Sequence, residues 1–428
     1  MKLELGEILI SDIQFGEKTE VKNGVLSVNK EELIALISED SRLKSVDLEI
    51  ARPGESVRIM PVKDVIEPRT KVSGAGHIFP GWFSGQEEMV GDGRTHVLKG
   101  AAVVTTGKVV GFQEGIIDMS GEGAKYTPYS TRNCLVVVAE PNDECSRYEH
   151  EEALRLAGLK SATYLGDAGK DVEPDKVETF EYSLLSDDEN LNKLPRVGYV
   201  YMLQSQGLLH DTYLYGKDAK NIIPTIISPT EVMDGAIVSG NCVSACDKNA
   251  TYIHMNNPVI HDLYERHGKD YNFVAVIVTN ENVTLSDKER SSNYVAKLAK
   301  ELKLDAAIVS EEGFGNPDAD LIMNCSKLEN LGIKTVLLTD EYAGRDGASQ
   351  SLADSHPKAD AVVTNSNANE VITIPPMEKV IGHQNYADVI AGGFDGSLHE
   401  DGSITVEIQA IMGSTCELGF NNLTARGY

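Results

Sequence analysis

A cysteine two residues after a glycine, close behind a short apolar run, is the strongest sign of chemistry in this chain. Ala236-Ile237-Val238 favours a short strand, and Ser239-Gly240-Asn241-Cys242 follows it at once. Because glycine adopts backbone angles that are closed to other residues, Gly240 permits a tight, strained turn just before the thiol. A strained turn beside a small nucleophile can lead a protein to attack its own backbone or a substrate. Asn241 and Cys242 are therefore the first candidate site residues.

A second cysteine, Cys246, leaves other interpretations open. Three residues separate it from Cys242, whereas a thioredoxin-type redox pair has two. On spacing alone, two buried or unreactive thiols at a turn are the simpler interpretation. A dithiol redox or scaffold protein and a non-catalytic protein also remain open, and both would stay one intact polypeptide.

The ten residues 239–248 resemble the self-cleavage site of a proprotein family. This family comprises the alpha/beta precursors of substrate-specific component B in the glycine, sarcosine and betaine reductases. The resemblance runs along essentially the whole chain, through Ala51-Arg52-Pro53-Gly54-Glu55-Ser56, Gly93-Arg94-Thr95-His96-Val97-Leu98-Lys99-Gly100, Glu114-Gly115-Ile116-Ile117-Asp118-Met119-Ser120 and Asp340-Glu341-Tyr342-Ala343-Gly344-Arg345-Asp346-Gly347 to Arg426-Gly427-Tyr428. It is closer to the glycine-type branch than to the D-proline reductase proprotein of the same wider group.

The resemblance implies that the chain cuts itself between Asn241 and Cys242. In this chemistry the cysteine thiolate attacks the preceding carbonyl, and an N-to-S acyl shift gives a thioester. Elimination then cuts the chain, and the dehydroalanine left at the new N-terminus hydrolyses to a pyruvoyl group. Only cysteine, serine or threonine carries a β-leaving group suited to this route. The expected products are residues 1–241 and a pyruvoyl-capped fragment that begins at position 242.

The resemblance also implies an enzyme, a pyruvoyl-dependent oxidoreductase that cleaves the C–N bond of glycine in amino-acid fermentation. The pyruvoyl carbonyl would act as a covalent cofactor, because a primary amine can form a Schiff base with it. Sarcosine or betaine reductase is the alternative, since no residue here discriminates among the three amines. The expected partners are a selenocysteine-containing subunit of component B, because this chain has no selenocysteine, together with selenoprotein A and the acyl-transfer component C.

Two further side chains are candidates for substrate binding. Arg345 could hold a substrate carboxylate through paired hydrogen bonds, or it could pair with Asp340 or Asp346. His210 could form an acid–base pair with the neighbouring Asp211. Adjacent residues point in different directions in most backbones, however, and this favours a structural role for His210.

Composition and charge exclude several classes of protein. The formal net charge of −27 argues against binding to nucleic acid or to an anionic membrane surface. The six cysteines are too sparse for a disulfide framework, and no spacing of cysteines or histidines suggests a metal site. The N-terminus carries acidic residues and no long apolar run, so we expect a cytoplasmic protein without a secretory signal or membrane span. Residues 311–317 contain G-x-G but also Glu311 and Glu312, which would repel a pyrophosphate, so we expect no nucleotide there.

The second half of the chain alternates between strand and helix patterns. We expect apolar strands at 196–203, 273–279, 306–310, 333–339 and 361–364, with helices at 287–302 and 317–331. Near-continuous Val/Ile/Leu strands separated by helices indicate a parallel sheet covered on both faces. We therefore predict an α/β fold with a C-terminal doubly wound parallel sheet, whose ligands bind at the carboxyl ends of its strands.

The first part of the chain is expected to be rich in strands. Strands are predicted at 8–10, 25–28 and 134–139, a hairpin at Asn23-Gly24, a hairpin of 103–104 with 109–110, helices at 30–40 and 149–159, and an extended glycine-rich loop over 71–100. These patterns predict three parts. A β-rich N-terminal domain covers residues 1–165, an acidic linker covers 166–194, and an α/β domain with the cleavage site covers 195–428.

Overall fold

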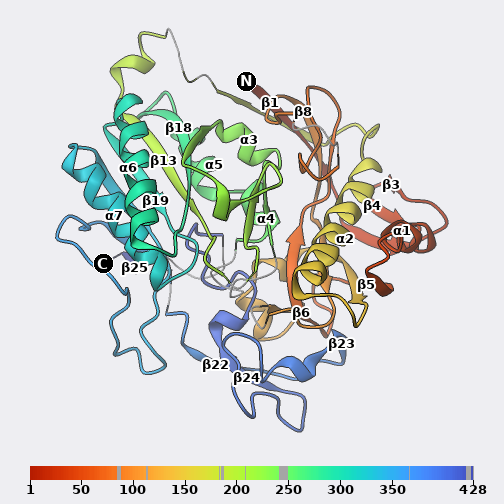
Figure 1. Ribbon diagram of the computed structural model, residues 1–428. Helices are drawn as coiled ribbons and strands as arrows, with labels where there is room; N and C mark the ends of the chain where they lie inside the picture. Colours follow the sequence, from red (N-terminus) through yellow and green to blue (C-terminus); the bar gives the residue numbers. More distant parts are fainter. Residues whose placement is uncertain are drawn as a thin grey trace.

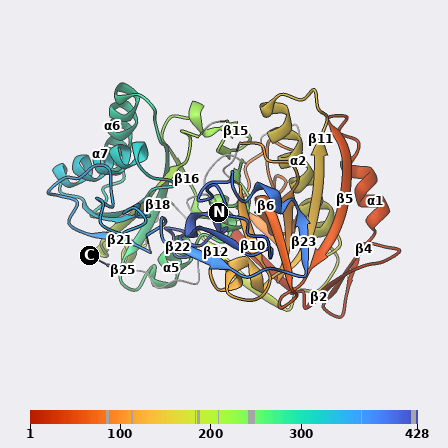
Figure 2. The same cartoon turned by 90° about the horizontal axis from the view of Figure 1, so that it is seen from below.

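Two large sheets lie side by side in this protein, each with helices packed against it (Figures 1 and 2). The computed structural model describes residues 1–83, 88–111, 114–182, 184, 188–207, 209–240, 249–365, 367–420 and 426–427. Residues 241–248, which include Asn241, Cys242 and Cys246, lie outside the described residues.

The N-terminal region is built on a six-stranded sheet with the order β10-β6-β9-β11-β5, to which β23 adds beside β6. Its strands are β5 (Leu43–Ala51), β6 (Val57–Ile66), β9 (Ala101–Thr106), β10 (Gly115–Asp118), β11 (Asn133–Pro141) and β23 (Lys379–Gly382). Residues of β11 alternate between two cores, as the period of two in a strand requires. Leu135 and Val137 share a core with Leu154 of helix α2 (Arg147–Asp167), while Cys134 and Val136 face the other core.

Smaller elements complete this region. A four-stranded sheet has the order β12-β1-β8-β7, with β1 (Lys2–Leu9), β7 (Arg69–Lys71), β8 (Gly93–Lys99) and β12 (Lys176–Glu181). A small sheet contains β2 (Asp12–Phe15), β3 (Glu20–Lys22) and β4 (Val25–Val28), followed by α1 (Lys30–Ile37). The predicted hairpin turn is confirmed between β3 and β4, where Asn23 and Gly24 both have positive φ.

The C-terminal region is built on a seven-stranded sheet with the order β16-β18-β13-β19-β20-β21-β25. Its strands are β13 (Arg196–Leu203), β16 (Thr225–Ile227), β18 (Asn272–Asn280), β19 (Ala306–Ser310), β20 (Lys334–Leu338), β21 (Val362–Thr364) and β25 (Arg426–Gly427). The five strands from β18 to β21 in this order run parallel, and the two outer strands run antiparallel to their neighbours.

Helices cover both faces of this parallel sheet. Val200 and Met202 of β13 share a core with α6 (Leu285–Glu301) and α7 (Asn316–Asn330). Tyr199 and Tyr201 of the same strand belong to a core that also contains residues of two helices, α4 (Thr251–Met255) and α5 (Pro258–Arg266). The protein thus has the predicted α/β fold, with a β-rich N-terminal region followed by a doubly wound parallel sheet.

The two regions are joined by more than the chain between them. One continuous core contains Leu3 and Val136 of the first region together with Tyr201 and Val276 of the second. Late in the chain, β23 returns to pair with β6; it lies in sequence between β22 (Val371–Ile374) and β24 (Ile404–Glu407), which pair with each other. Residues 166–194, expected as a linker, contain β12, which pairs with β1. The division into three parts stays a prediction.

Some expected elements differ from the observed ones. The stretch 103–110 forms β9 alone and no hairpin, because β9 pairs with β6 and β11 instead. The loop expected over 71–100 ends in a seven-residue strand, β8, whose central residues are buried. Helix α2 is 21 residues long and not 11, since a capping box between Ser146 and Glu149 starts it two residues early and it continues to Asp167, beyond the expected end at residue 159.

Candidate functional site

The described chain reaches residues 241–248, the predicted cleavage segment, through a short antiparallel pair of strands. β17 (Ile237–Ser239) pairs with β14 (Thr212–Leu214), and the Gly240 N–H donates a hydrogen bond to the Asp211 carbonyl at 2.5 Å. A Cβ atom at Gly240 would lie 2.1 Å from the His210 carbonyl oxygen. Glycine is therefore required here for lack of space. The expected strained turn is not found at Gly240 itself, whose φ is not in the left-handed region.

Asn249, the first described residue after the segment, is fully buried and held by three side chains. Its backbone N–H donates to Glu312 Oε1 at 3.1 Å, and its side-chain amide donates to Glu417 Oε1 at 2.7 Å. The Cys416 thiol donates to Asn249 Oδ1 at 3.3 Å. This end of the segment is thus fixed by a network that includes two buried glutamates.

The two ends of the segment lie close together. The Ser239 N–H donates to Thr251 Oγ1 at 2.9 Å, which ties β17 to the start of α4. Thr251 also donates to Asp64 of β6, at 2.9 Å from its N–H and 2.6 Å from its hydroxyl. The described residues that flank 241–248 therefore lie close together, next to both large sheets.

These flanking residues lie at the edge of the parallel sheet that is formed by the carboxyl ends of its strands. Gln204, Glu281, Glu311 and Asp340 follow β13, β18, β19 and β20, directly or after one residue. Glu312 joins this edge to the segment, because Oε2 accepts from the Gln204 N–H at 2.9 Å while Oε1 accepts from Asn249. In doubly wound sheets, ligands bind outside the carboxyl ends of the strands.

Carboxyl groups without a cation partner are concentrated at this edge. Neither carboxyl oxygen of Glu281 has a hydrogen-bond partner among the described residues, and the same holds for Oε1 of Glu311 and Oδ1 of Asp211. Burial holds the pKa values of Glu281 and Glu311 well above the ordinary range, and neighbouring carboxylates add to the effect. Burial also raises the pKa of Asp211 to about 7. Burial therefore favours the neutral forms of Glu281 and Glu311, and Asp211 titrates near pH 7.

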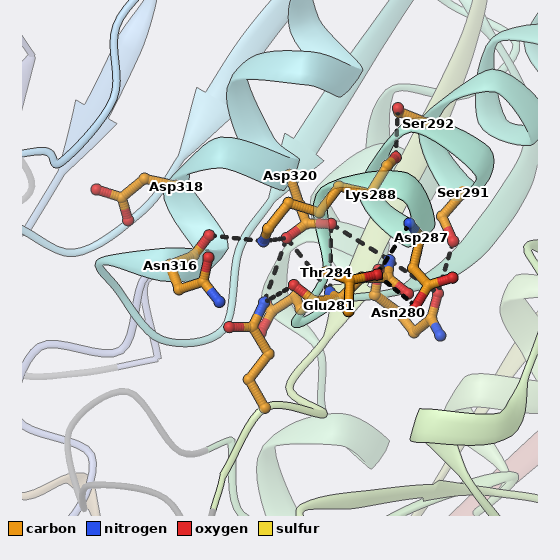
Figure 3. A network of polar contacts seen from close by, with 12 residues as sticks. Asn280, Glu281, Thr284, Asp287, Lys288, Ser291, Ser292, Asn316, Asp318 and Asp320 are labelled. Carbon is orange, nitrogen blue, oxygen red and sulfur yellow. Dashed lines mark hydrogen bonds and ion pairs between the residues drawn. The ribbon is translucent and has the colours of Figure 1, made fainter.

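Beside them lies one buried ion pair (Figure 3). Lys288 near the start of α6 binds Asp320 of α7 and donates to the Asn316 carbonyl at 2.8 Å. Asp320 also accepts from Asn282 at 3.3 Å, in the loop after β18. This network joins the first turns of the two helices to the strand end that carries Glu281, and it fixes the backbone there.

His210 and Arg345 bind partners other than those expected from the sequence. The His210 ring bonds to Asp218 Oδ2 at 2.5 Å and not to Asp211, whereas its backbone carbonyl packs against Gly240. Arg345 pairs with Glu407 of β24 at 2.6 Å and not with Asp340 or Asp346. Each side chain thus has a structural partner, and a role in substrate binding stays a prediction for both.

Several residues of this site were not singled out from the sequence as site residues. Glu281 and Asn249 are the clearest cases, and Glu312 was considered only as a residue that repels phosphate. A usable signal was present, since Asn280-Glu281-Asn282 and Glu311-Glu312 directly follow apolar strands. Glu417 and Cys416 reach the site from a late part of the chain that carries no comparable pattern.

In the part of the chain that the structure describes, no three His, Cys, Asp or Glu residues are grouped so that they could hold a metal ion. Within the same residues, no helix combines the length and the apolar character needed to cross a membrane.

Comparison with known proteins places the chain among reductase subunits. Residues 1–426 match the family model for glycine/sarcosine/betaine reductase component B subunits. Over the full length of both chains, the protein is 66% identical to the glycine reductase complex component B subunits alpha and beta of Acetoanaerobium sticklandii. It is 57% identical to the sarcosine reductase complex component B subunit alpha of Peptoclostridium acidaminophilum, again over both full lengths.

A more distant relative is the D-proline reductase proprotein PrdA of A. sticklandii, which is 19% identical over 76% of this chain and 53% of its own. No solved structure matches the chain. The match to the family model over nearly every residue and the identity to full-length relatives agree with the resemblance at the cleavage motif. The chain belongs to the family of glycine/sarcosine/betaine reductase component B subunits.

Proposed function

We propose that this chain is a self-cleaving precursor that cuts itself between Asn241 and Cys242 and serves glycine reduction. The thiolate of Cys242 attacks the Asn241 carbonyl, and the peptide C–N bond is exchanged for a C–S bond. Elimination then breaks the Cβ–S bond, so the sulfur leaves with the N-terminal fragment as a thiocarboxylate. The remaining dehydroalanine takes up water and releases ammonia, which gives a pyruvoyl group at position 242.

The observation that carries this proposal is the way both ends of residues 241–248 are held. Gly240 hydrogen-bonds to Asp211, Asn249 hydrogen-bonds to Glu312 and Glu417, and Ser239 hydrogen-bonds to Thr251. A bond that cuts itself must be held against its nucleophile, because proximity and orientation supply much of the rate. The motif with the required cysteine is therefore anchored on both sides, at the edge where this class of sheet binds ligands.

The fold also supports a protein that works after it has been cut. β13 and β16 precede the proposed cut and β18 to β21 follow it, yet β18 lies between β16 and β13 in one sheet. The two fragments would share this sheet and its cores, so they should remain associated. The cut would create a new chain end at the site without dividing the protein.

The residues at this edge fit a pyruvoyl group. Its two carbonyl groups are neutral and accept hydrogen bonds, whereas ionised carboxylates would repel them. Burial favours the neutral forms of Glu281 and Glu311, and both have oxygens without partners among the described residues, so their carboxylic acid groups can donate hydrogen bonds there. When formed, the group supplies a carbonyl carbon that is electrophilic towards the nitrogen of an amino-acid substrate.

Glycine is the substrate that the similarity favours, because the glycine reductase relative is 66% identical and the sarcosine reductase relative 57%. We infer partners of the kind the family uses, namely a selenocysteine-containing subunit of component B, selenoprotein A and the acyl-transfer component C. The selenolate would take the carboxymethyl carbon while nitrogen leaves. Cys134, Cys145, Cys325 and Cys416 are free thiols, which supports a reducing compartment, and we propose the cytoplasm.

The experiment that tests the proposal compares Cys242→Ala with Cys242→Ser. The alanine variant lacks both the nucleophile and the leaving group, so it should stay one folded, uncut chain without reductase activity. The serine variant can make the same shift through an ester but is a poorer nucleophile and leaving group. It should be cut slowly or not at all, and any cut product should carry the same pyruvoyl group.

Borohydride trapping with radiolabelled glycine supplies the second measurement. Label should appear on the fragment that begins at position 242 in the wild type, and on no fragment of Cys242→Ala. Label on a lysine of residues 1–241, or full activity of uncut Cys242→Ala, would overturn the pyruvoyl assignment. An uncut wild-type chain would instead favour the dithiol or non-catalytic alternatives.

A further inference from the structure

Asp211 and Glu281 are buried carboxyl groups that the proposed cleavage chemistry does not use. Asp211 is 1% exposed and Glu281 2% exposed. Asp211 Oδ2 accepts from the Gly207 N–H at 2.7 Å, but Oδ1 has no hydrogen-bond partner, and neither oxygen of Glu281 has one among the described residues. A buried polar atom without a partner lowers stability, so a purely structural role does not explain these three oxygens.

The backbones of both residues are fixed beside the cleavage segment. The Asp211 carbonyl accepts from Gly240, and the next residue, Thr212, pairs with Ser239 of β17. The Glu281 N–H donates to Ser205 Oγ at 3.0 Å, and the same hydroxyl donates to the Glu281 carbonyl. Glu281 follows β18 and the loop that carries Asp211 follows β13, its neighbour in the sheet. Both carboxyl groups thus lie at one edge, at the point where the chain enters residues 241–248.

The charges around the pair make the two groups different. Burial raises the pKa of Asp211 to about 7; Lys220 and His210 oppose this rise, and Asp218 supports it. Glu281 faces the carboxyl groups of Glu311, Glu312, Asp320 and Asp211, which add to burial and hold its pKa well above the ordinary range. A group that titrates near the working pH is suited to move protons, whereas the surroundings of Glu281 favour its neutral form.

We propose that Asp211 is the acid–base residue that exchanges a proton with the nitrogen of the amino-acid substrate, and that Glu281 is a neutral positioning residue beside it. This inference rests on the proposed function, because an amino acid arrives with an ammonium nitrogen that has no free electron pair for a carbonyl carbon. One N–H bond breaks, its electron pair stays on nitrogen, and the proton forms an O–H bond at Asp211 Oδ1. The step needs no further reactant. Glu281 adds no negative charge and can donate a hydrogen bond.

The Asp211→Asn variant, assayed in the assembled complex with glycine, tests the first half of this proposal. We expect intact-mass analysis to show normal cleavage, since Asp211 is assigned to the substrate step. The kcat/KM for ammonia release should fall about 10²-fold, and the acidic limb of its pH profile should disappear. Infrared spectroscopy of the wild type should show a carboxyl band that titrates near pH 7 and is absent from the variant.

Asp305→Asn is the matched control, because Asp305 lies at the opposite edge of the same sheet and accepts from the Arg196 N–H at 2.7 Å. It should keep the wild-type pH profile. Retention of the acidic limb and of kcat/KM in Asp211→Asn would overturn the assignment, and so would a block of cleavage, which would place Asp211 in the processing step. A wild-type chain that is uncut or lacks a carbonyl group would instead refute the proposed function.

Glu281→Gln tests the second half, because glutamine is neutral and can still donate a hydrogen bond. The variant should keep the acidic limb and stay within about threefold of the wild-type kcat/KM, with normal cleavage. It should lose the infrared band of a carboxylic acid that the wild type retains at pH 7. Glu281→Ala, which removes the donor, should lower kcat/KM about tenfold. A wild type without that band at pH 7, or an acidic limb displaced by more than about one pH unit in Glu281→Gln, would overturn the neutral role.

Discussion

The buried carboxyl groups of Glu67 and Glu114 in the N-terminal region are paired with cations, whereas those of Glu281 and Asp211 at the edge of the parallel sheet are not. In and beside the N-terminal sheets, Glu67 pairs with Arg69 at 2.6 Å and Glu114 pairs with Lys63 at 3.1 Å, all with side chains at most 1% exposed. At the carboxyl edge of the parallel sheet, Glu281 has no cation and no hydrogen-bond partner among the described residues, and Asp211 has one free oxygen.

The pKa values of Glu67 and Asp211 show how this difference in pairing affects their protonation. Burial alone would raise the pKa of Glu67, but Lys99 and Arg69 lower it to about 2. Burial raises the pKa of Asp211 to about 7, because its surroundings do not compensate. Similar burial therefore gives a permanent charge that joins strands in one region and an exchangeable proton in the other.

The largest expected effect on stability comes from Glu67→Gln. The change leaves the buried guanidinium of Arg69 without its anion, so we expect a loss of about 3–5 kcal/mol in the free energy of unfolding at pH 7. Because the folded pKa of Glu67 is lowered, its contribution is present above the unfolded value of about 4.5 and is lost as the pH falls towards 2. Urea unfolding at pH 7 and pH 3, in the uncut Cys242→Ala background, measures both effects.

Glu49→Gln is the control, since Glu49 pairs with Lys379 on the surface at 2.7 Å. Its loss should be below about 1 kcal/mol at either pH. Equal losses for the two variants would remove the distinction between the buried pair and an exposed one.

An effect of the opposite sign is expected for the pH dependence of the stability of Asp211→Asn. Because the folded pKa of Asp211 is raised, the wild type is most stable below the unfolded value of 3.8 and loses stability as the pH rises through about 7. The variant lacks this loss, so its stability relative to the wild type should increase with pH between 4 and 7, by at most about 1.4 kcal/mol for each pH unit. Urea unfolding of both proteins at pH 4 and pH 8 would measure this change. A relative stability independent of pH would mean that Asp211 is not held in its neutral form.

The smallest effect is expected at Arg345, whose side chain is about half exposed and pairs with Glu407. Arg345→Gln should change the free energy of unfolding by less than about 1 kcal/mol, as is usual for exposed ion pairs. The KM for glycine in the same variant then tests the remaining prediction. A tenfold rise would establish Arg345 as a ligand of the substrate carboxylate, and an unchanged KM would leave it with Glu407 alone.

The parallel sheet could be predicted almost strand by strand. Its apolar runs are long, buried on both faces and separated by amphipathic helices, so local pattern and tertiary environment agree. The expected strand at 306–310 coincides with β19, and the expected helix at 317–331 with α7 within one residue at each end. The N-terminal sheets were harder to predict, because pairings such as β12 with β1 and β23 with β6 join residues far apart in the chain.

The site could be predicted only in part, for a similar reason. Cys242 and Asn241 form a contiguous motif that is readable from the sequence. The environment of that motif is assembled from Asp211, Glu281, Glu312 and Glu417, which lie on separate loops. Gly240 was linked to a strained turn, whereas the structure requires it for space beside His210. Contacts of this kind depend on strand order and register, which no local pattern contains.

The central claim is that the chain cuts itself between Asn241 and Cys242, and intact-mass analysis of the purified wild-type protein tests it most directly. The account predicts two chains, one ending at Asn241 and one beginning at position 242, where a carbonyl oxygen replaces the nitrogen of Cys242 and a hydrogen atom replaces its sulfur. A carbonyl reagent should add to the second chain only. A single mass of 46.5 kDa that does not react with the reagent would contradict the account.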